Sequence, residues 1–452
     1  MKKLRTVIIL TIIIILFLPI NTIFGVDNID KKDYNPDNLT TNSPSIILMD
    51  AKTGKILYSK DAFKRRYPAS TTKLMTAILT LENCKLTDVA TVSHNAIYSI
   101  PVGYSHASLK EGEKLTIEQL LNVLLIPSAN DAAIVLAEHI AGSEEKFAEM
   151  MNNKAKELGC LDTHFVNPNG IHKENHYSTA YDLSLIGRYA MQFDEIMRIA
   201  KISQYTLPKT NKYNKTDRIF NATNALIDKN ENYYYEYATG LKTGYTDKAG
   251  SCIVSTAEKN GIKLIEVILG SESVTDRYKD CIKLFDYGFE NYSYKNLVTS
   301  NDVIDTIEIK DATKETKSLN VIAKDNIDIL LKNTIDTYNL EPKIELKENL
   351  VAPISQDEVI GSISYEIDGE TYSTDLIAEH TVIASNFETI LFRALLIFLI
   401  LYILVIILKK LNGPKNKRKK YSSHSKTNYQ SRKKTKSHKG GRYKFTQIQD
   451  YL

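Results

Sequence analysis

The sequence lacks the residue patterns that hold metal ions or mark a redox pair. Four cysteines are spread over 452 residues with no C-x-x-C pair, and nine histidines show no H-E-x-x-H or comparable spacing. Zinc sites depend on such spacing, so none is indicated. The positions of the cysteines do not require a disulfide either. We therefore expect no metal and no cofactor.

A basic excess is also missing from most of the chain. The formal net charge is +4, but residues 409–452 carry fifteen Lys and Arg against one acid, and residues 1–25 carry three basic residues. The stretch 26–408 therefore has a net charge of about −13. Because phosphate backbones are bound by basic surfaces, this part of the chain is not expected to bind nucleic acid.

Long apolar runs occur only near the two ends. The run Val7–Ile20 follows a basic start and is short for a spanning helix, so residues 1–25 are predicted to be a secretory signal peptide. An uncleaved membrane anchor is the alternative. Residues 390–408 approach the length needed to cross a bilayer and end at Lys409-Lys410. This pattern predicts a transmembrane helix with the basic tail, 409–452, in the cytoplasm. The alternative is a buried core helix.

Between these runs the sequence predicts a linker and two folded units. Residues 26–42 are polar and suit a linker. In 43–290, a β-hairpin is followed by a block of helices, then by two strands and a helix, which predicts an α+β domain whose sheet is completed by both ends of the domain. Residues 291–380 contain short β-branched runs and predict a small β-rich domain.

Three short motifs with chemical meaning occur in order along the larger unit. Ser70-Thr71-Thr72-Lys73 opens a predicted helix, Ser128-Ala129-Asn130 lies between two predicted helices, and Lys242-Thr243-Gly244 lies on a predicted edge strand. This S-x-x-K, S-x-N and K-T-G set is found in serine enzymes that react with β-lactams.

Each motif is weak by itself, because the chain contains further copies. Ser143, Ser423 and Ser431 also have a lysine three residues later, Ser93-His94-Asn95 is a second S-x-N, and Lys52-Thr53-Gly54 is a second K-T-G. Only the set beginning at Ser70 has the required order and the required structural contexts. We therefore take this set as the candidate site.

The chemistry explains the first spacing. Ser70 and Lys73, at i and i+3, share one face of a helix, so the amine can reach the hydroxyl and take its proton. Lys73 can do so only when neutral, and burial, the helix N-terminus and the nearby Lys242 all lower its pKa.

The remaining residues have roles in proton transfer and binding. Ser128 can relay a proton to the leaving amine, and Asn130 can hold the substrate amide. Lys242 and Thr243 can bind a terminal carboxylate, and Gly244 allows a close approach of the ligand to the strand. The backbone N–H groups of Ser70 and Tyr245 are expected to form an oxyanion hole.

At these motifs the chain resembles the low-molecular-weight penicillin-binding proteins, which are D-alanyl-D-alanine carboxypeptidases of the serine type. The resemblance is carried by the stretches Tyr67–Thr76, Pro127–Ala133 and Gly240–Thr246, by Asn167–Gly170 and Ser178–Asp182 between them, and farther along by Leu350–Ile354 and Val359–Gly361.

The resemblance extends over about residues 43–380 and implies a penicilloyl-serine transferase fold of the β-lactamase and transpeptidase type, followed by a β-rich domain. It also implies removal of the terminal D-alanine from peptidoglycan pentapeptide stems, an acyl-enzyme, and inhibition by β-lactam antibiotics such as penicillin. Some family members have His where this chain has Tyr245, which affects pH dependence or substrate preference.

The basic tail is expected to bind membrane lipid. The alternative is that the tail only maintains the orientation of the chain in the membrane.

Three other functions use overlapping features. A peptidoglycan D,D-endopeptidase would use the same residues on cross-linked peptides. A class A-like β-lactamase would need a carboxylate that deacylates quickly, but no E-x-x-L-N pattern lies between Ser128 and Lys242. A non-catalytic wall-binding protein would not need Lys73.

Overall fold

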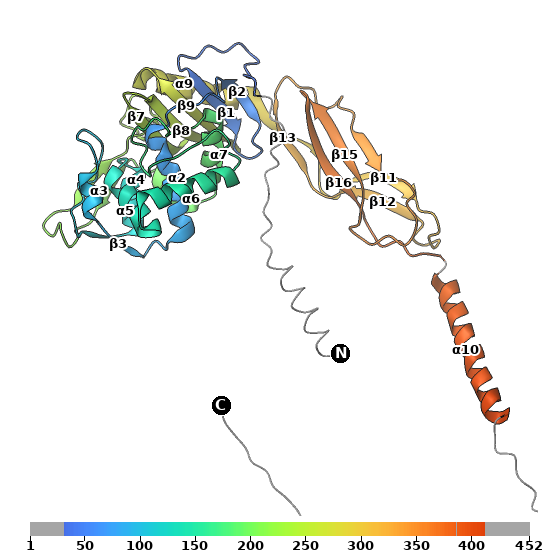
Figure 1. Cartoon of the computed structure of the whole chain (residues 1–452). Helices are drawn as coiled ribbons and strands as arrows, with labels where there is room; N and C mark the ends of the chain where they lie inside the picture. The colour runs from blue at the N-terminus through green and yellow to red at the C-terminus, as the bar shows by residue number, and fades with distance from the viewer. Residues whose placement is uncertain (1–30, 386, 412–452) are drawn as a thin grey trace, which may run out of the picture.

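The computed structural model describes residues 31–385 and 387–411. The predicted signal peptide, 1–25, and nearly all of the predicted basic tail, 409–452, lie outside these residues. Figure 1 shows an α+β domain, a β-rich domain beside it and a single helix, α10, beyond the β-rich domain.

The α+β domain is built on a five-stranded antiparallel sheet in the order β2-β1-β9-β8-β7. The first hairpin of the chain pairs with the last strand of the domain, as the sequence predicts, and β7 is left as an edge strand. The strands are β1 (Ser45–Asp50), β2 (Ile56–Lys60), β7 (Ala238–Thr246), β8 (Gly250–Lys259) and β9 (Ile262–Ser271).

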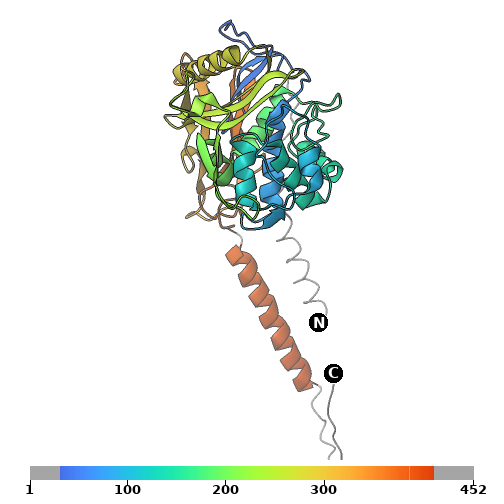
Figure 2. The same ribbon diagram turned by 90° about the vertical axis from the view of Figure 1, so that its left-hand side faces the viewer.

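Both faces of this sheet are buried. Along β1, Ile47 and Met49 point into the core on the helical side, whereas Ile46 and Leu48 point into the core under α9 (Val274–Asn291). Alternate side chains of a strand face opposite sides, so a strand covered on both faces is apolar throughout. Figure 2 shows this layered arrangement from the side.

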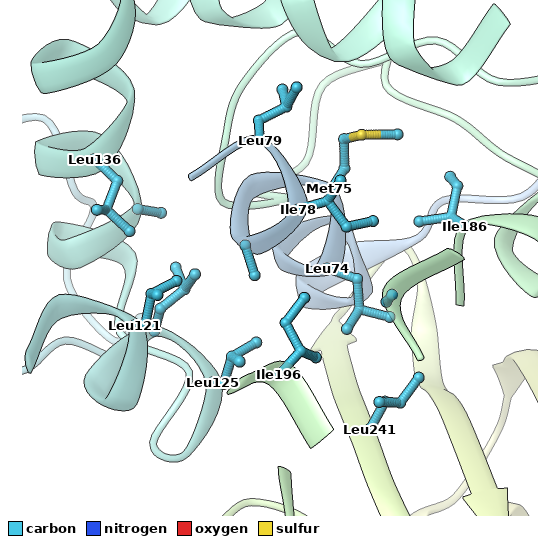
Figure 3. Close-up of a cluster of buried hydrophobic side chains, with 14 of the residues drawn as sticks. Leu74, Met75, Ile78, Leu79, Leu121, Leu125, Leu136, Ile186, Ile196 and Leu241 are labelled. Carbon is cyan, nitrogen blue, oxygen red and sulfur yellow. The ribbon is translucent and has the colours of Figure 1, made fainter. Parts of the chain in front are cut away.

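The helical side is organised around α2, which lies in the centre of the larger core (Figure 3). The helix α2 contacts α4 and α5, and its buried side chains Leu74 and Ile78 belong to the same cluster as Leu241 of β7. The helices are α2 (Lys73–Asn83), α3 (His94–Tyr98), α4 (Ile117–Leu125), α5 (Asn130–Ala141), α6 (Glu144–Glu157), α7 (Ala180–Ala190) and α8 (Asp194–Ala200).

Two short hairpins add to the domain beyond the sequence-based expectation. The polar, Tyr- and Asn-rich stretch from 203 to 235 contains β5 (Gln204–Leu207), β6 (Arg218–Asn221) and the 3-10 turn η2 (Ala225–Ile227). This stretch has few apolar residues, so its sequence shows little of the periodic pattern that predicts strands. The other hairpin pairs β3 (Val89–Thr91) with β4 (Lys114–Thr116).

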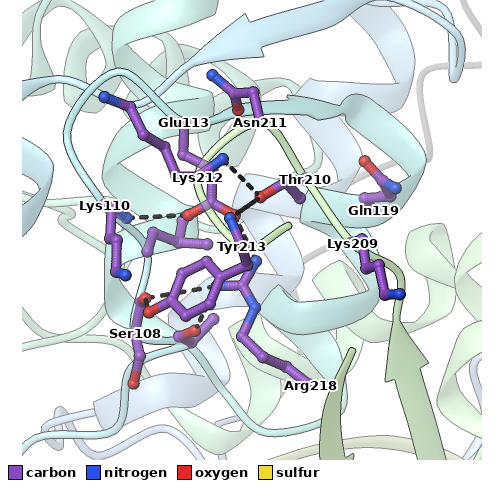
Figure 4. A network of polar contacts seen from close by, with 12 residues as sticks. Ser108, Lys110, Glu113, Gln119, Lys209, Thr210, Asn211, Lys212, Tyr213 and Arg218 are labelled. Carbon is purple, nitrogen blue, oxygen red and sulfur yellow. Dashed lines mark hydrogen bonds and ion pairs between the residues drawn. The ribbon is translucent and has the colours of Figure 1, made fainter. Parts of the chain in front are cut away.

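A buried ion pair fixes the β5–β6 hairpin to the loop before β4 (Figure 4). The Glu113 carboxylate is fully buried and accepts hydrogen bonds from the Arg218 guanidinium, from the Lys110 N–H at 2.9 Å and from Thr210 Oγ1 at 2.7 Å. The Tyr213 ring stacks on the Arg218 guanidinium at 3.9 Å. This network holds two surface segments together where few apolar side chains are available.

The second domain is β-rich, as predicted. It contains a five-stranded sheet in the order β11-β12-β16-β15-β14 and a two-stranded pair, β10-β13, around a core of its own. The pair β10-β13 was not predicted. The strands are β10 (Tyr292–Val298), β11 (Val303–Glu308), β12 (Ser318–Ala323), β13 (Ile327–Lys332), β14 (Lys343–Leu346), β15 (Val359–Ile367) and β16 (Glu370–Ala378).

The turn between β1 and β2 contacts the second domain. Tyr294 donates a hydrogen bond to Asp50 Oδ1 at 2.7 Å, and Lys52 lies 3.8 Å from the carboxylate of Asp328. Lys55 Nζ lies 3.0 Å from the hydroxyl of Tyr372. The second K-T-G motif, Lys52-Thr53-Gly54, therefore belongs to a contact between domains.

The helix α10 (Phe387–Leu411) is apolar on all sides. Its segment Thr389–Lys410 has 22 residues and contains an 18-residue window with a mean hydropathy of 3.1, none of which is buried against the described part of the chain. Its length and composition are sufficient for crossing a membrane.

The Glu113 network yields a stability prediction. Glu113→Ala leaves the Arg218 guanidinium buried without its counter-ion, so we expect a loss of about 3–5 kcal/mol in the free energy of unfolding of the α+β domain, measured by denaturant titration. The control is Glu258→Ala in the same domain, which removes a half-exposed ion pair with Lys263 and should cost little. Equal losses in the two variants would contradict the role given to this network.

Candidate active site

A cavity of about 680 Å³ opens between the helices and the free edge of β7. Six of the eight residues singled out in the sequence line it, namely Ser70, Ser128, Asn130, Thr243, Gly244 and Tyr245. The other two, Lys73 and Lys242, are buried below its surface, and their amines contact residues of the cavity wall. The three motifs thus meet at one place although up to 170 residues separate them in sequence.

The Ser70–Lys73 pair lies where the chain enters the central helix. Residues Ala69–Thr72 form a 3-10 turn, η1, that leads into α2, so the helix begins slightly later than the pattern predicted. Lys73 Nζ lies 2.8 Å from Ser70 Oγ. Since α2 is held in the centre of the core, the position of both side chains is fixed by packing.

Lys73 has three polar neighbours that define its hydrogen bonding. Besides Ser70 Oγ, its Nζ lies 2.8 Å from Asn130 Oδ1 and 2.7 Å from the backbone oxygen of Asn169. A neutral amine can donate to these two acceptors and still accept a proton from the serine hydroxyl. The arrangement therefore fits a general base.

The electrostatic surroundings favour the neutral amine. Complete burial lowers the pKa of Lys73 well below the ordinary value of a lysine, and the nearby charge of Lys242 lowers it further, while Asp131 acts in the opposite direction. Asp131 itself is buried and accepts hydrogen bonds from the N–H groups of Ala107 and Leu109. Its charge is thus largely engaged in holding the loop that forms one wall of the cavity.

Ser128 sits in a strained turn between α4 and α5. Its backbone has φ of +65°, in the left-handed region that costs energy for a residue with a side chain. Its Oγ is buried and has no hydrogen-bond partner among the described residues. An unpartnered hydroxyl on the cavity wall is available to a substrate atom.

The amide of Asn130 is oriented by contacts at both ends. Its Nδ2 donates to the backbone oxygen of Ser105 at 2.8 Å, and its Oδ1 faces Lys73. The amide therefore links Lys73 to the 105–109 loop, and its orientation follows from the donor and acceptor at each end.

Lys242 and Arg277 place two cations at one end of the cavity. Lys242 Nζ lies 3.0 Å from the Thr243 backbone oxygen. Burial, and then the charge of Arg277, lower the pKa of Lys242 to about 7. Thr243 Oγ1 is 2.6 Å from Thr223 Oγ1. Two cations and a hydroxyl form an arrangement suited to a carboxylate.

Gly244 allows the edge strand to approach the nucleophile. A Cβ at this position would lie 2.8 Å from the Ser70 nitrogen and 3.0 Å from the Ala69 Cβ. Such contacts are too short, so any side chain would push β7 away from the serine. The next residue, Tyr245, directs its side chain outward, with 60% of its surface exposed.

Three contributions to the site were not identified as site residues from the sequence. The backbone oxygen of Asn169 contacts Lys73, Arg277 lines the cavity from α9, and Thr223 contacts Thr243. The stretch around Asn169 was noticed only through the family resemblance. Arg277 and Thr223 carried no signal, because single residues on an amphipathic helix and in a polar loop resemble ordinary surface residues.

The further copies of the motifs that lie within the described residues have structural roles. Ser143 caps α6 by accepting a hydrogen bond from the Lys146 N–H, and Ser93 caps α3 by accepting one from Ala96. Ser423 and Ser431 lie outside the described residues. All four cysteines lie within the described ranges and are free.

Comparison with known proteins agrees with this geometry. The family described as D-alanyl-D-alanine carboxypeptidase matches residues 31–273, and the family described as penicillin-binding protein 5, C-terminal domain, matches residues 292–386. The chain is 31% identical over 386 residues to D-alanyl-D-alanine carboxypeptidase DacF of Bacillus subtilis (strain 168), which covers 84% of this chain and 94% of that protein.

Two further relatives extend the comparison. D-alanyl-D-alanine carboxypeptidase DacC of Escherichia coli (strain K12) is 31% identical and covers 74% of this chain and 83% of its own length. The crystal structure of penicillin binding protein 5 from Haemophilus influenzae superposes with a TM-score of 0.65 at 27% identity, over 77% of this chain and 99% of that one. With the fold, the family matches and these relatives in agreement, the chain belongs to the family of serine D-alanyl-D-alanine carboxypeptidases, the low-molecular-weight penicillin-binding proteins.

Proposed function

We propose that this chain removes the terminal D-alanine from peptidoglycan pentapeptide stems through an acyl-enzyme on Ser70, and that penicillin inhibits it by acylating the same serine. The observation that carries the proposal is the buried Lys73 amine, which lies 2.8 Å from Ser70 Oγ and whose pKa is lowered by burial toward the neutral form that a general base requires. Family membership supports the substrate class.

The first chemical step follows from the contacts of Lys73. Lys73 accepts the proton of Ser70, whose Oγ attacks the carbonyl carbon of the penultimate D-alanine. The oxyanion that forms is stabilised by the N–H groups of Ser70 and Tyr245. The proton then reaches the leaving amine through Ser128, whose hydroxyl has no other partner among the described residues. D-alanine departs and Ser70 carries the ester.

The second step returns the enzyme to its starting state. A water molecule enters the space that D-alanine has left, and Lys73 accepts its proton as the water attacks the ester carbonyl. The bond to Ser70 Oγ breaks as Lys73 returns the proton to that oxygen, and the shortened peptide leaves with a new carboxylate. Asn130 holds the peptide amide during both steps.

Selectivity for a free peptide end comes from the cationic end of the cavity. Lys242, Thr243 and Arg277 bind the terminal carboxylate, which places the last peptide bond at Ser70. A D,D-endopeptidase would act on a cross-linked peptide at the same serine and is the second candidate. β-Lactams carry a carboxylate, as the free end of the peptide does, which explains why the drug enters the same cavity.

The proposed nucleophile is tested by covalent labelling. Labelled penicillin should attach to wild-type protein at Ser70, and Ser70→Ala should remove the label because it removes the hydroxyl that lies 2.8 Å from the Lys73 amine. The peptide that carries the label is identified by mass spectrometry. The matched control is Ser143→Ala, which removes the S-x-x-K copy at a helix cap and should be labelled like wild type. Label that persists in Ser70→Ala rejects the assignment.

The two buried lysines predict a particular pH dependence. Lys73 acts only when neutral, so the acylation rate constant at saturating peptide should rise with pH through its lowered pKa and level off below the ordinary range of lysine. Lys242 binds the carboxylate only when protonated, and its pKa is about 7 in the free enzyme. The ratio kcat/KM should therefore fall as pH rises above this value.

The control for the alkaline side is Lys242→Arg. Arginine keeps its charge at every pH used, so the alkaline fall in kcat/KM should disappear in this variant, while the dependence on the acid side remains. The pH dependence on the acid side and on the alkaline side is measured from initial rates of D-alanine release. An alkaline fall that persists in Lys242→Arg would show that Lys242 does not produce it.

We also propose a topology for the chain. In this proposal residues 1–25 direct export, 26–42 are a linker, 43–290 and 291–380 are the extracytoplasmic catalytic and β-rich domains, and α10 crosses the membrane once. The proposal is supported by the apolar surface of α10 and the basic residues that follow it. The tail, 409–452, then lies in the cytoplasm against anionic membrane lipid.

Protease protection tests this topology. Protease added to intact protoplasts should degrade residues 43–380 and spare a tag placed after Leu452, because only the tail is shielded by the membrane. Lysis of the protoplasts is the control and should expose the tag. If residues 43–380 were protected and the tag were degraded, the orientation of the chain in the membrane would be opposite to the one proposed.

A further inference from the structure

The loop formed by residues 166–171 is attached to the beginning of α2 at the active site. The backbone oxygen of Asn169 lies 2.7 Å from Lys73 Nζ. The backbone oxygen of Pro168 accepts a hydrogen bond from Thr76 Oγ1 at 2.6 Å. The position of the 166–171 loop therefore decides where one of the two acceptors of the Lys73 amine lies.

A buried histidine, His176, joins this loop to the turn η1. Only 2% of its surface is exposed, and its ring packs edge-on against the ring of Phe165. Its Nε2 lies 2.8 Å from Oγ1 of Thr72, the residue directly before Lys73. Its Nδ1 accepts a hydrogen bond at 3.2 Å from the backbone N–H of Val166, at the start of the loop. One side chain thus contacts both the turn that leads into the general base and the loop that carries its acceptor.

The two hydrogen bonds fix which nitrogen of the His176 ring carries the proton. A backbone N–H can only donate, so Nδ1 is the acceptor, and the neutral ring donates from Nε2 to Thr72 Oγ1. Burial is the main cause that lowers the pKa of His176 to about 3. The titratable groups that face the ring act in the same direction and belong to His164, His172 and Lys73. The ring is therefore neutral, with both hydrogen bonds intact, at any pH near neutrality.

The side chain of Asn167 has a different role in the same loop. Its Oδ1 accepts a hydrogen bond from the Gly170 N–H at 2.7 Å, and its Nδ2 donates to the backbone oxygen of Ile171 at 2.8 Å. Both partners belong to the loop, so these bonds give the loop its shape. The bond between His176 and Thr72 instead attaches the loop to η1. The contact there is close, because a Cβ at Gly170 would overlap a backbone oxygen of η1.

Resting on the proposed function, we propose that His176 is a positioning residue, which holds this loop against η1 and thereby keeps the backbone oxygen of Asn169 on the Lys73 amine. His176 itself touches no reacting atom. When Asn169 and Asn130 each accept one hydrogen of the neutral amine, its lone pair is left to face Ser70 Oγ. Without the link the loop moves away from α2, the amine loses this orientation, and water reaches it.

The experiment compares the full-length wild type, solubilised in detergent, with three variants. Thr72→Val and His176→Leu break the link from its two sides with side chains of similar size that form no hydrogen bond. The matched control is His164→Gln, since His164 comes just before the same loop but its Nδ1 donates to the backbone oxygen of Asn175. The quantities measured are kcat and KM for D-alanine release from Nα,Nε-diacetyl-L-lysyl-D-alanyl-D-alanine as a function of pH. Each kcat is calculated per site that labelled penicillin titrates.

Both variants of the link should lower kcat by about 10- to 100-fold, because a small misplacement of a catalytic group costs about this much. KM should stay within about twofold of the wild-type value, because the residues that bind the terminal carboxylate are not changed. His164→Gln should match the wild type in both quantities.

The pH dependence gives a second readout. Water around Lys73 brings its pKa back toward the ordinary value of lysine, and the amine acts only when neutral. The rise of kcat on the acid side should therefore move to higher pH in Thr72→Val and His176→Leu. The charged groups that face the amine, Lys242 and Asp131, are the same in all the proteins compared.

Three results would overturn the inference. Wild-type kcat and pH dependence in Thr72→Val would show that the hydrogen bond does not hold the loop, and this variant decides the question if His176→Leu gives no titratable protein. Fewer titratable sites with normal kcat per site would show a role in folding only. An equal change in His164→Gln would show that the effect is not specific to the link. Absence of D-alanine release by the wild type would instead reject the proposed function, and the inference with it.

Discussion

The proposed mechanism depends on a Lys73 amine that is buried next to Ser70 and whose pKa is lowered by that burial. A lysine in water is protonated and cannot act as a base at neutral pH. Here the amine is removed from water and lies beside a second buried cation, so its pKa falls, while Asn130 and Asn169 supply acceptors that satisfy its hydrogens. The rest of the fold can be understood as the means of maintaining this environment.

Three parts of the fold hold Lys73 in place. The helix α2 is surrounded by apolar side chains and is thereby fixed (Figure 3). The strained Ser128 turn and Asn130 come from the junction of α4 and α5, which Asp131 ties to the neighbouring loop. The edge strand β7 approaches closely because Gly244 has no side chain. A displacement of any of these elements would admit water to the lysine and raise its pKa.

Much of this arrangement was predictable because it rests on local patterns. The apolar spacing of the helices, the S-x-x-K spacing of Ser70 and Lys73, and the position of Lys242 on an edge strand are visible in the sequence. Arg277, Thr223 and the backbone oxygen of Asn169 were not predictable as site residues, since their roles come only from tertiary packing. The β5–β6 hairpin was missed for a related reason: the buried Glu113–Arg218 pair ties it to the loop before β4, and such a pair leaves no periodic signal.

The central claim is that the acyl-enzyme is released quickly after a peptide and slowly after a penicillin. D-alanine leaves the cavity and makes room for water, whereas the opened ring of penicillin remains attached and blocks the approach. The most direct measurement follows D-alanine release and intact protein mass when the full-length protein is given a pentapeptide and, separately, penicillin. The account predicts many turnovers of the peptide and a lasting adduct of one penicillin per protein. Rapid hydrolysis of penicillin without D-alanine release would contradict it and identify a β-lactamase.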